Sequence, residues 1–115
     1  MNREEAKQLL IERLQPYVGR PYKELSQFVG REHIEKITMS SGIEYYFQLD
    51  VAPVNEDEDA LIVDGLVTEV HGRRLLPPTE QATFTITPED KICHISPELH
   101  WKREEAEQAS SSNGG

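Results

Sequence analysis

Carboxylates are the residues of this chain whose number and spacing could support chemistry. Between Lys36 and Arg73 the chain has no Lys or Arg, and this stretch carries eight Asp or Glu residues. They are Glu44, Asp50, Glu56, Asp57, Glu58, Asp59, Asp64 and Glu69. Carboxylates can bind cations, transfer protons or attract basic partners. The stretch supplies −8 of the formal net charge of −9, so it is the first place to look for a site.

Acid–base catalysis by paired carboxyl groups requires one group whose pKa is raised by burial. Asp64 is the candidate, because it interrupts a stretch of otherwise mainly apolar residues. Eight acids can be paired in many ways, and no spacing selects one pair. The sequence therefore predicts no catalytic residue, and it favours a non-enzymatic protein over an enzyme.

Metal binding has two candidate segments. The acidic run at residues 55–59 offers several oxygens, but it lacks the spacing, the glycine and the terminal Glu of an EF-hand loop. Cys93 and His94, with His100 nearby, match no zinc signature, and no second ligand pair follows. We predict a solvated loop at 55–59, no metal site and no cofactor. Cys93 is interpreted as a small apolar residue of the core.

The charge and composition exclude several classes of function. A net charge of −9 disfavours binding to nucleic-acid phosphates or to anionic lipid, and favours basic partners. A single cysteine allows no intramolecular disulfide. No apolar run approaches the roughly 20 residues that span a bilayer, and the charged N-terminus has no signal-peptide core. We therefore expect a cytoplasmic protein.

The first third of the chain predicts helices. Residues 3–15 show helical spacing of apolar side chains, and Pro16 is expected to end that helix. The apolar face comprises Ala6, Leu9, Leu10, Leu14 and Tyr17. Residues 21–29 indicate a second short helix that ends at Gly30. The pattern also allows this segment to continue the first helix after a kink at 16–19.

From residue 33 the hydrophobic period changes to two, which is typical of strands. The pattern predicts strands at 33–39, 43–51, 60–71, 82–87 and 92–95. The segment 43–51 shows the clearest strand pattern. Its inward face is expected to comprise Ile43, Tyr45, Phe47, Leu49 and Val51, and its outward face Glu44, Tyr46, Gln48 and Asp50.

The strand at 60–71 presents a conflict. Straight alternation places Asp64 on the same face as Ile62 and Leu66. Because burial of an unpaired carboxylate is costly, we predict a β-bulge at Asp64 and Gly65 that reverses the later alternation. The bulge would turn Leu61, Val63, Leu66, Thr68 and Val70 inward, and Ile62, Asp64, Val67, Glu69 and His71 outward.

The order of elements predicts an α+β fold, in which one N-terminal helix, or two, packs on one face of a four- to five-stranded antiparallel meander. This order resembles that of cystatin-like and NTF2-like folds. The inhibitory motif of cystatins, glutamine-any-valine-any-glycine, is absent, so the resemblance covers element order only and implies no function. We expect one domain over residues 1–101, anchored by Trp101, and a polar, disordered tail over 102–115.

These patterns predict a protein-interaction module that uses an acidic outer sheet face and an acidic loop. The expected binding residues are Glu44, Tyr46, Asp50, Glu56, Asp57, Glu58, Asp59, Asp64 and Glu69. The partner would be a protein with a basic or amphipathic surface, and a homodimer through a sheet edge or face is a variant. The alternative is a small-molecule or catalytic pocket centred on Asp64, with Tyr17, Tyr45, Phe47 and Phe84 as its lining and His71 as a further polar group.

Overall fold

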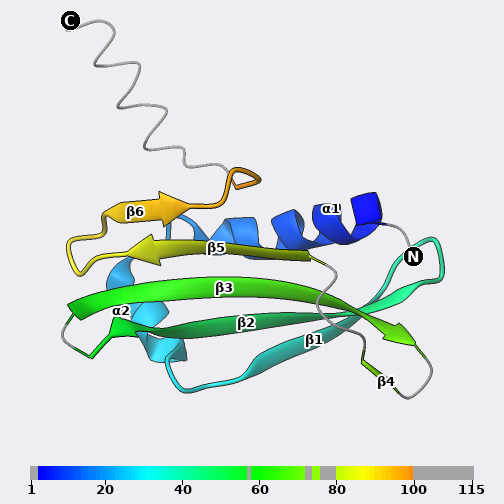
Figure 1. Ribbon diagram of the computed structural model, residues 1–115, viewed down its shortest axis with the longest axis horizontal. Coiled ribbons are helices and arrows are strands. Elements are labelled where there is room, and N and C mark those ends of the chain that lie inside the picture. The colour runs from blue at the N-terminus through cyan, green and yellow to red at the C-terminus, as the bar shows by residue number, and fades with distance from the viewer. Residues whose placement is uncertain (1–2, 57, 72–73, 76–79, 100–115) are drawn as a thin grey trace, which may run out of the picture.

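The protein is an α+β domain in which two short helices cover one face of an antiparallel sheet (Figure 1). The computed structural model describes the backbone of residues 3–56, 58–71, 74–75 and 80–99, and the side chains of these residues except 58, 71 and 74–75. The expected anchor at Trp101, the tail at 102–115 and a polar role for His71 fall outside the described residues or side chains. The predicted fold class is confirmed.

Helix α1 (Arg3–Leu14) packs against the sheet through Ala6, Leu9, Leu10 and Leu14, all of which are buried. The short turn η1 (Gln15–Tyr17) follows at once, because Pro16 cannot continue an α-helix. Helix α2 (Tyr22–Leu25) and the turn η2 (Ser26–Phe28) are separate from it. The structure therefore has a separate second helix and not a kinked continuation of α1. Neither of these described helices is long and apolar enough to cross a membrane.

The sheet has the strand order β1-β2-β3-β5-β6, so each of these strands lies beside its predecessor in the meander. These strands are β1 (His33–Thr38), β2 (Glu44–Asn55), β3 (Glu58–His71), β5 (Glu80–Ile86) and β6 (Ile92–Ile95). All pairings are antiparallel. A two-residue strand that the sequence pattern did not predict, β4 (Arg74–Leu75), pairs with β3.

The core lies between α1 and the helix-facing side of the sheet. Strand β2 contributes Tyr45, Phe47, Leu49 and Val51, as the two-residue period predicted. Strand β5 contributes Ala82, Phe84 and Ile86. The aromatic rings of Tyr45, Phe47 and Phe84 are at most 1% exposed and belong to one cluster of buried side chains. These residues are the largest fully buried side chains of the core.

The predicted bulge at Asp64 and Gly65 is wrong. The pairing of β3 with β2 runs without a shift from Glu69 to Leu61, and its pairing with β5 is also regular. Gly65 instead faces α1, where an added Cβ would lie 2.9 Å from Cδ2 of Leu14. A glycine in a strand can mark a bulge or a close approach, and here it allows the helix to approach the sheet.

Regular alternation reverses the expected faces of the second half of β3. Val67 is buried in the core, and Glu69 shares its face, because it lies opposite the buried Tyr45. Leu66 and Thr68 lie instead on the outer face, where they are half-buried. The predicted directions of Leu66, Val67, Thr68, Glu69 and Val70 were therefore wrong.

Candidate functional site

The face of the sheet that points away from α1 carries two carboxylates side by side. Asp50 of β2 and Asp64 of β3 are direct cross-strand partners, and Thr83 of β5 lies next to Asp64 in the same row. Asp50 is exposed and Asp64 is half-buried. Like charges directly opposite one another on neighbouring strands destabilise a sheet by roughly 0.2–1 kcal/mol. This pair is therefore an unfavourable local arrangement of charge.

The neighbouring residues of β2 and β3 on this face carry no charge. Gln48 and Leu66 form the adjacent row on one side, and Ala52 and Ile62 form the row on the other. No basic side chain of the described residues forms an ion pair with either aspartate. The pair therefore has no compensating charge within the described part of the protein.

Lys36 is the basic residue of β1 on this face, and it is engaged elsewhere. Its Nζ lies 2.8 Å from Oε2 of Glu44 on β2. This hydrogen bond and the charge of Glu44 raise the pKa of the Lys36 ammonium group. Glu44 was an expected binding residue, and it already forms an ion pair within the protein.

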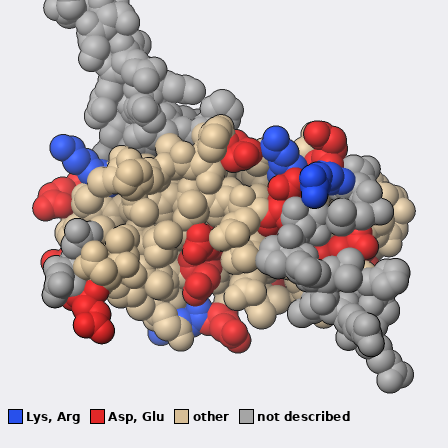
Figure 2. Space-filling model, in the orientation of Figure 1, with Lys and Arg blue, Asp and Glu red and all other residues tan. Residues whose placement is uncertain are grey.

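The other expected binding residues come from different parts of the sheet and from the turn between β2 and β3. Figure 2 shows the carboxylates of one face of the molecule as separate small groups, several of them beside a Lys or Arg side chain. Tyr46 is half-buried on the outer face opposite Thr68, and Glu56 is exposed in the turn between β2 and β3. Asp59 is exposed near the start of β3. Asp57 and the side chain of Glu58 lie outside what the structure describes.

Glu69 lies on the helix-facing side of the sheet, so its expected place on the outer surface was wrong. Its Oε1 atom is buried and has no hydrogen-bond partner within the described part of the chain. At the same end of the core, Glu5 accepts hydrogen bonds from the Ser41 hydroxyl, over 2.7 Å, and from the Tyr45 hydroxyl, over 3.3 Å. The sequence pattern did not indicate this small polar group.

The regular alternation of β3 also determines whether Asp64 can share a pocket with the aromatic residues. Asp64 points to the open face, whereas Tyr45, Phe47 and Phe84 lie in the packed core on the other side of the sheet. Tyr17 packs edge-on against Phe28, with ring centroids 5.8 Å apart. The structure therefore does not bring Asp64 together with the aromatic residues expected to share a pocket with it.

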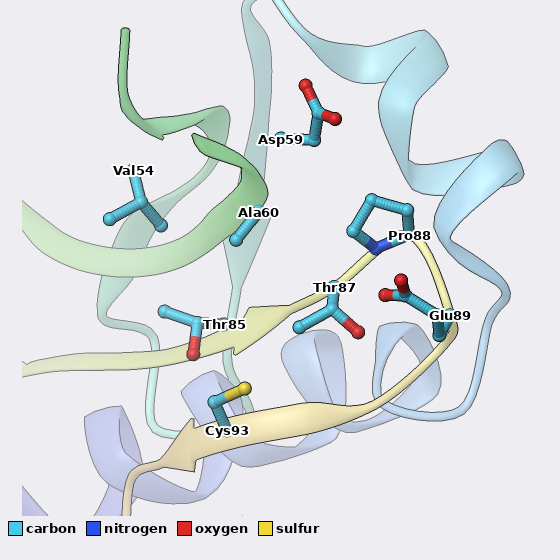
Figure 3. Close-up of a pocket in the computed structure, with 8 residues that line it drawn as sticks. All are labelled: Val54, Asp59, Ala60, Thr85, Thr87, Pro88, Glu89 and Cys93. Atoms are coloured by element: carbon cyan, nitrogen blue, oxygen red, sulfur yellow. The ribbon is translucent and has the colours of Figure 1, made fainter. Parts of the chain in front are cut away.

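A groove of about 440 Å³ lies at one end of the sheet (Figure 3). Its lining comes from β2, β3, β5, β6 and the turn between β5 and β6, and comprises Val54, Asp59, Ala60, Thr85, Thr87, Pro88, Glu89 and Cys93. Cys93 is exposed, so its predicted place in the core was wrong. A register shift in the pairing of β5 with β6, next to Thr85, accompanies this exposure.

Tyr22 of α2 is hydrogen-bonded to the β5–β6 turn and to the start of β3, both beside this groove. Its backbone N–H donates to Oδ1 of Asp90 over 2.7 Å, and its hydroxyl donates to the backbone carbonyl of Asp59. Asp90 has a φ of 65°, a left-handed conformation in which Asp and Asn are tolerated better than most residues. The shape of the groove therefore depends on α2 as well as on the sheet.

Comparisons with known proteins add no further constraint. No family model, curated protein or solved structure matches this chain significantly. Among the described residues, no group of three or more His, Cys, Asp or Glu side chains is placed to hold a metal ion. The candidate site is therefore defined by its own geometry: an open sheet face with an uncompensated carboxylate pair and a groove at one end.

Proposed function

We propose that this chain is a small, non-enzymatic protein-interaction module that binds a basic or amphipathic segment of a partner on its outer sheet face. The observation that carries the proposal is the cross-strand pairing of Asp50 with Asp64 without a basic neighbour among the described side chains. A partner's Lys or Arg placed between the two carboxylates would replace repulsion by two charge-assisted contacts. Relief of the repulsion between Asp50 and Asp64 would therefore favour the bound state.

Apolar side chains around the pair support the same function. Tyr46, Ile62 and Leu66 are half-buried on this face, so each still presents surface to a partner. Protein interfaces combine aromatic and aliphatic contact area with a polar rim, and complementary charge sets the rate and specificity of association. A partner segment with both basic and apolar residues would match this face.

Self-association is a variant of the proposal. Strand β1 is an edge of the sheet, and its Ile34 is 51% exposed. Exposed edge strands can pair with a second copy. Sedimentation equilibrium over a range of concentrations tests this variant, and a monomer at all concentrations would contradict it.

The test of the main proposal is removal of the two charges without a change of shape. The double variant Asp50→Asn with Asp64→Asn should stay folded and lose basic partners in a pull-down from cell extract. Glu12→Gln, on the exposed side of α1, is the matched control and should retain them. An unchanged set of partners for the double variant would refute the proposal.

A further inference from the structure

The groove and the carboxylate pair lie on one line along β3. Counting along the outer face from Asp64, the next outward residue is Ile62, and the one after it is Ala60, which lines the groove. Outward residues of a strand repeat at about 6.8 Å, so the groove begins about 14 Å from the pair. Thr85 of β5, which lies opposite Ile62, also lines the groove, and so does Thr87 in the turn after β5.

The groove combines apolar walls with carboxylates. Val54, Ala60 and Pro88 supply apolar surface, and the side chains of Asp59 and Glu89 are exposed. In Figure 3 Asp59 lies at the upper end of the view, and the Glu89 carboxylate lies near Thr87 and Pro88. Neither acid forms an ion pair with a described basic residue. Such surroundings suit a side chain with an apolar stem and a cationic head, as in Lys or Arg.

We propose that the groove is a second subsite for the same partner segment, and this inference rests on the proposed function. The segment is extended and lies along β3. It places one basic side chain at the Asp50–Asp64 pair, an apolar side chain over Ile62, and a second basic side chain in the groove. Because an extended peptide has the same repeat as a strand, the two basic residues are four positions apart.

The groove is held in shape before a ligand arrives. The hydrogen bonds from Tyr22 to Asp90 and to the carbonyl of Asp59 connect the β5–β6 turn and the start of β3 to α2. The hydroxyl oxygens of Thr85 and Thr87 accept the backbone N–H groups of His94 and Lys91, which fixes the β5–β6 turn. A preformed site loses less conformational entropy on binding than a flexible one.

The test uses the full-length chain and two short peptides that have the same composition as each other. In the first peptide two lysines stand four positions apart with a leucine midway and alanines elsewhere. In the second the lysines are adjacent. Isothermal titration calorimetry should show the first peptide binding about ten-fold more tightly. Cys93 is the single cysteine and lines the groove, so the first peptide at saturation should slow its alkylation by iodoacetamide several-fold.

Charge-removing variants separate the two subsites. Asp59→Asn with Glu89→Gln should reduce the affinity for the first peptide to that for the second. Glu4→Gln with Glu12→Gln, on the exposed side of α1, is the matched control and should change neither affinity. Asp50→Asn with Asp64→Asn should weaken both peptides.

Each outcome decides one of the two claims. Equal affinity for the two peptides, or unprotected Cys93, would overturn the groove subsite. If the Asp50 and Asp64 variant weakens both peptides but the Asp59 and Glu89 variant changes nothing, the proposed function stands and the groove subsite is wrong. If neither peptide binds, or if neutralising Asp50 and Asp64 has no effect, the proposed function is wrong as well.

Discussion

Gly65 of β3 lies under Leu14 of α1, where a Cβ atom would come within 2.9 Å of Cδ2 of Leu14. Cδ1 of Leu10 would lie 3.1 Å from the same point. The absence of a side chain therefore sets how closely the helix approaches the sheet. Because the inward position is taken by Gly65, its neighbour Asp64 points to the open face.

The first prediction concerns this contact. Gly65→Ala should destabilise the fold by roughly 1–3 kcal/mol, because the Leu14 and Leu10 methyl groups must move within a packed core. The lower chain entropy of alanine in the unfolded state offsets only part of this. Urea denaturation measures the change. In a Leu14→Ala background, which provides space, the added Cβ should be nearly neutral, and an equal loss in both backgrounds would show that the contact is not the cause.

The second prediction concerns repulsion between Asp50 and Asp64. Asp64→Asn should raise the free energy of unfolding by up to about 1 kcal/mol at low salt, because it removes a like-charge pair on neighbouring strands. The gain should shrink as salt is added, since screening weakens the repulsion in the parent protein. Chemical denaturation at several salt concentrations tests this, with Glu12→Gln as the control. A loss of stability would contradict the prediction.

The third prediction concerns the hydrogen bond between Tyr22 and Asp90. Asp90→Ala should cost about 1–2 kcal/mol, because the first backbone N–H of α2 loses its side-chain acceptor and alanine is strained at positive φ. Asp90→Asn keeps a carbonyl acceptor and tolerates this backbone conformation, so it should remain close to the parent. Thermal and urea unfolding of the two variants measure these changes in stability. Equal loss in both would mean that the negative charge, rather than the cap, is what matters.

The fourth prediction concerns Glu69. Replacement by methionine should stabilise the protein by about 1 kcal/mol, because a buried carboxylate oxygen without a described partner is removed. The same variant should leave partner binding unchanged, since Glu69 lies on the helix-facing side of the sheet. Denaturation and the pull-down used for Asp50 and Asp64 measure the two effects. Loss of partners by a stably folded Glu69→Met variant would contradict this prediction and show that Glu69 takes part in binding.

The fifth prediction concerns pH. The hydrogen bond and charge of Glu44 raise the pKa of Lys36 above its ordinary value of 10.5, so the folded state holds this proton more tightly than the unfolded state. The resulting stability is fully present below the unfolded-state pKa and is lost as the pH rises through the folded-state pKa. Glu44→Gln should lower the Lys36 midpoint in an NMR titration, and an unchanged midpoint would contradict this cause.

Much of the fold could be predicted from local pattern. The positions of β2 and β5 and the inward residues Tyr45, Phe47 and Phe84 follow from a two-residue period that each strand carries by itself. The strand ends do not, since β2 continues to Asn55 and β5 begins at Glu80. Helix α1 follows from its apolar spacing and from Pro16. These features depend on neighbours in the chain, so no knowledge of distant segments is needed.

The candidate site could be predicted only in part. The acidic character of the middle segment and the outward positions of Asp50 and Tyr46 were evident from residue types and alternation. The groove was not, because it forms where four strands and a turn come together at one end of the sheet. The exposure of Cys93 accompanies a register shift between β5 and β6, which residue pattern alone does not indicate.

Local sequence patterns indicated the described helices and strands other than β4, the alternating faces of β2 and β5, and a middle segment without a basic residue, because all three are properties of neighbouring residues. The packing of α1 on the sheet was needed to show that Gly65 serves the approach of α1 rather than a bulge, and that Asp50 therefore meets Asp64 across the sheet. Strand register and helix position arise from contacts between distant parts of the chain, which local patterns do not contain. A one-residue difference in alternation exchanges the two faces of a strand, so those contacts also decided that Glu69 faces the helix.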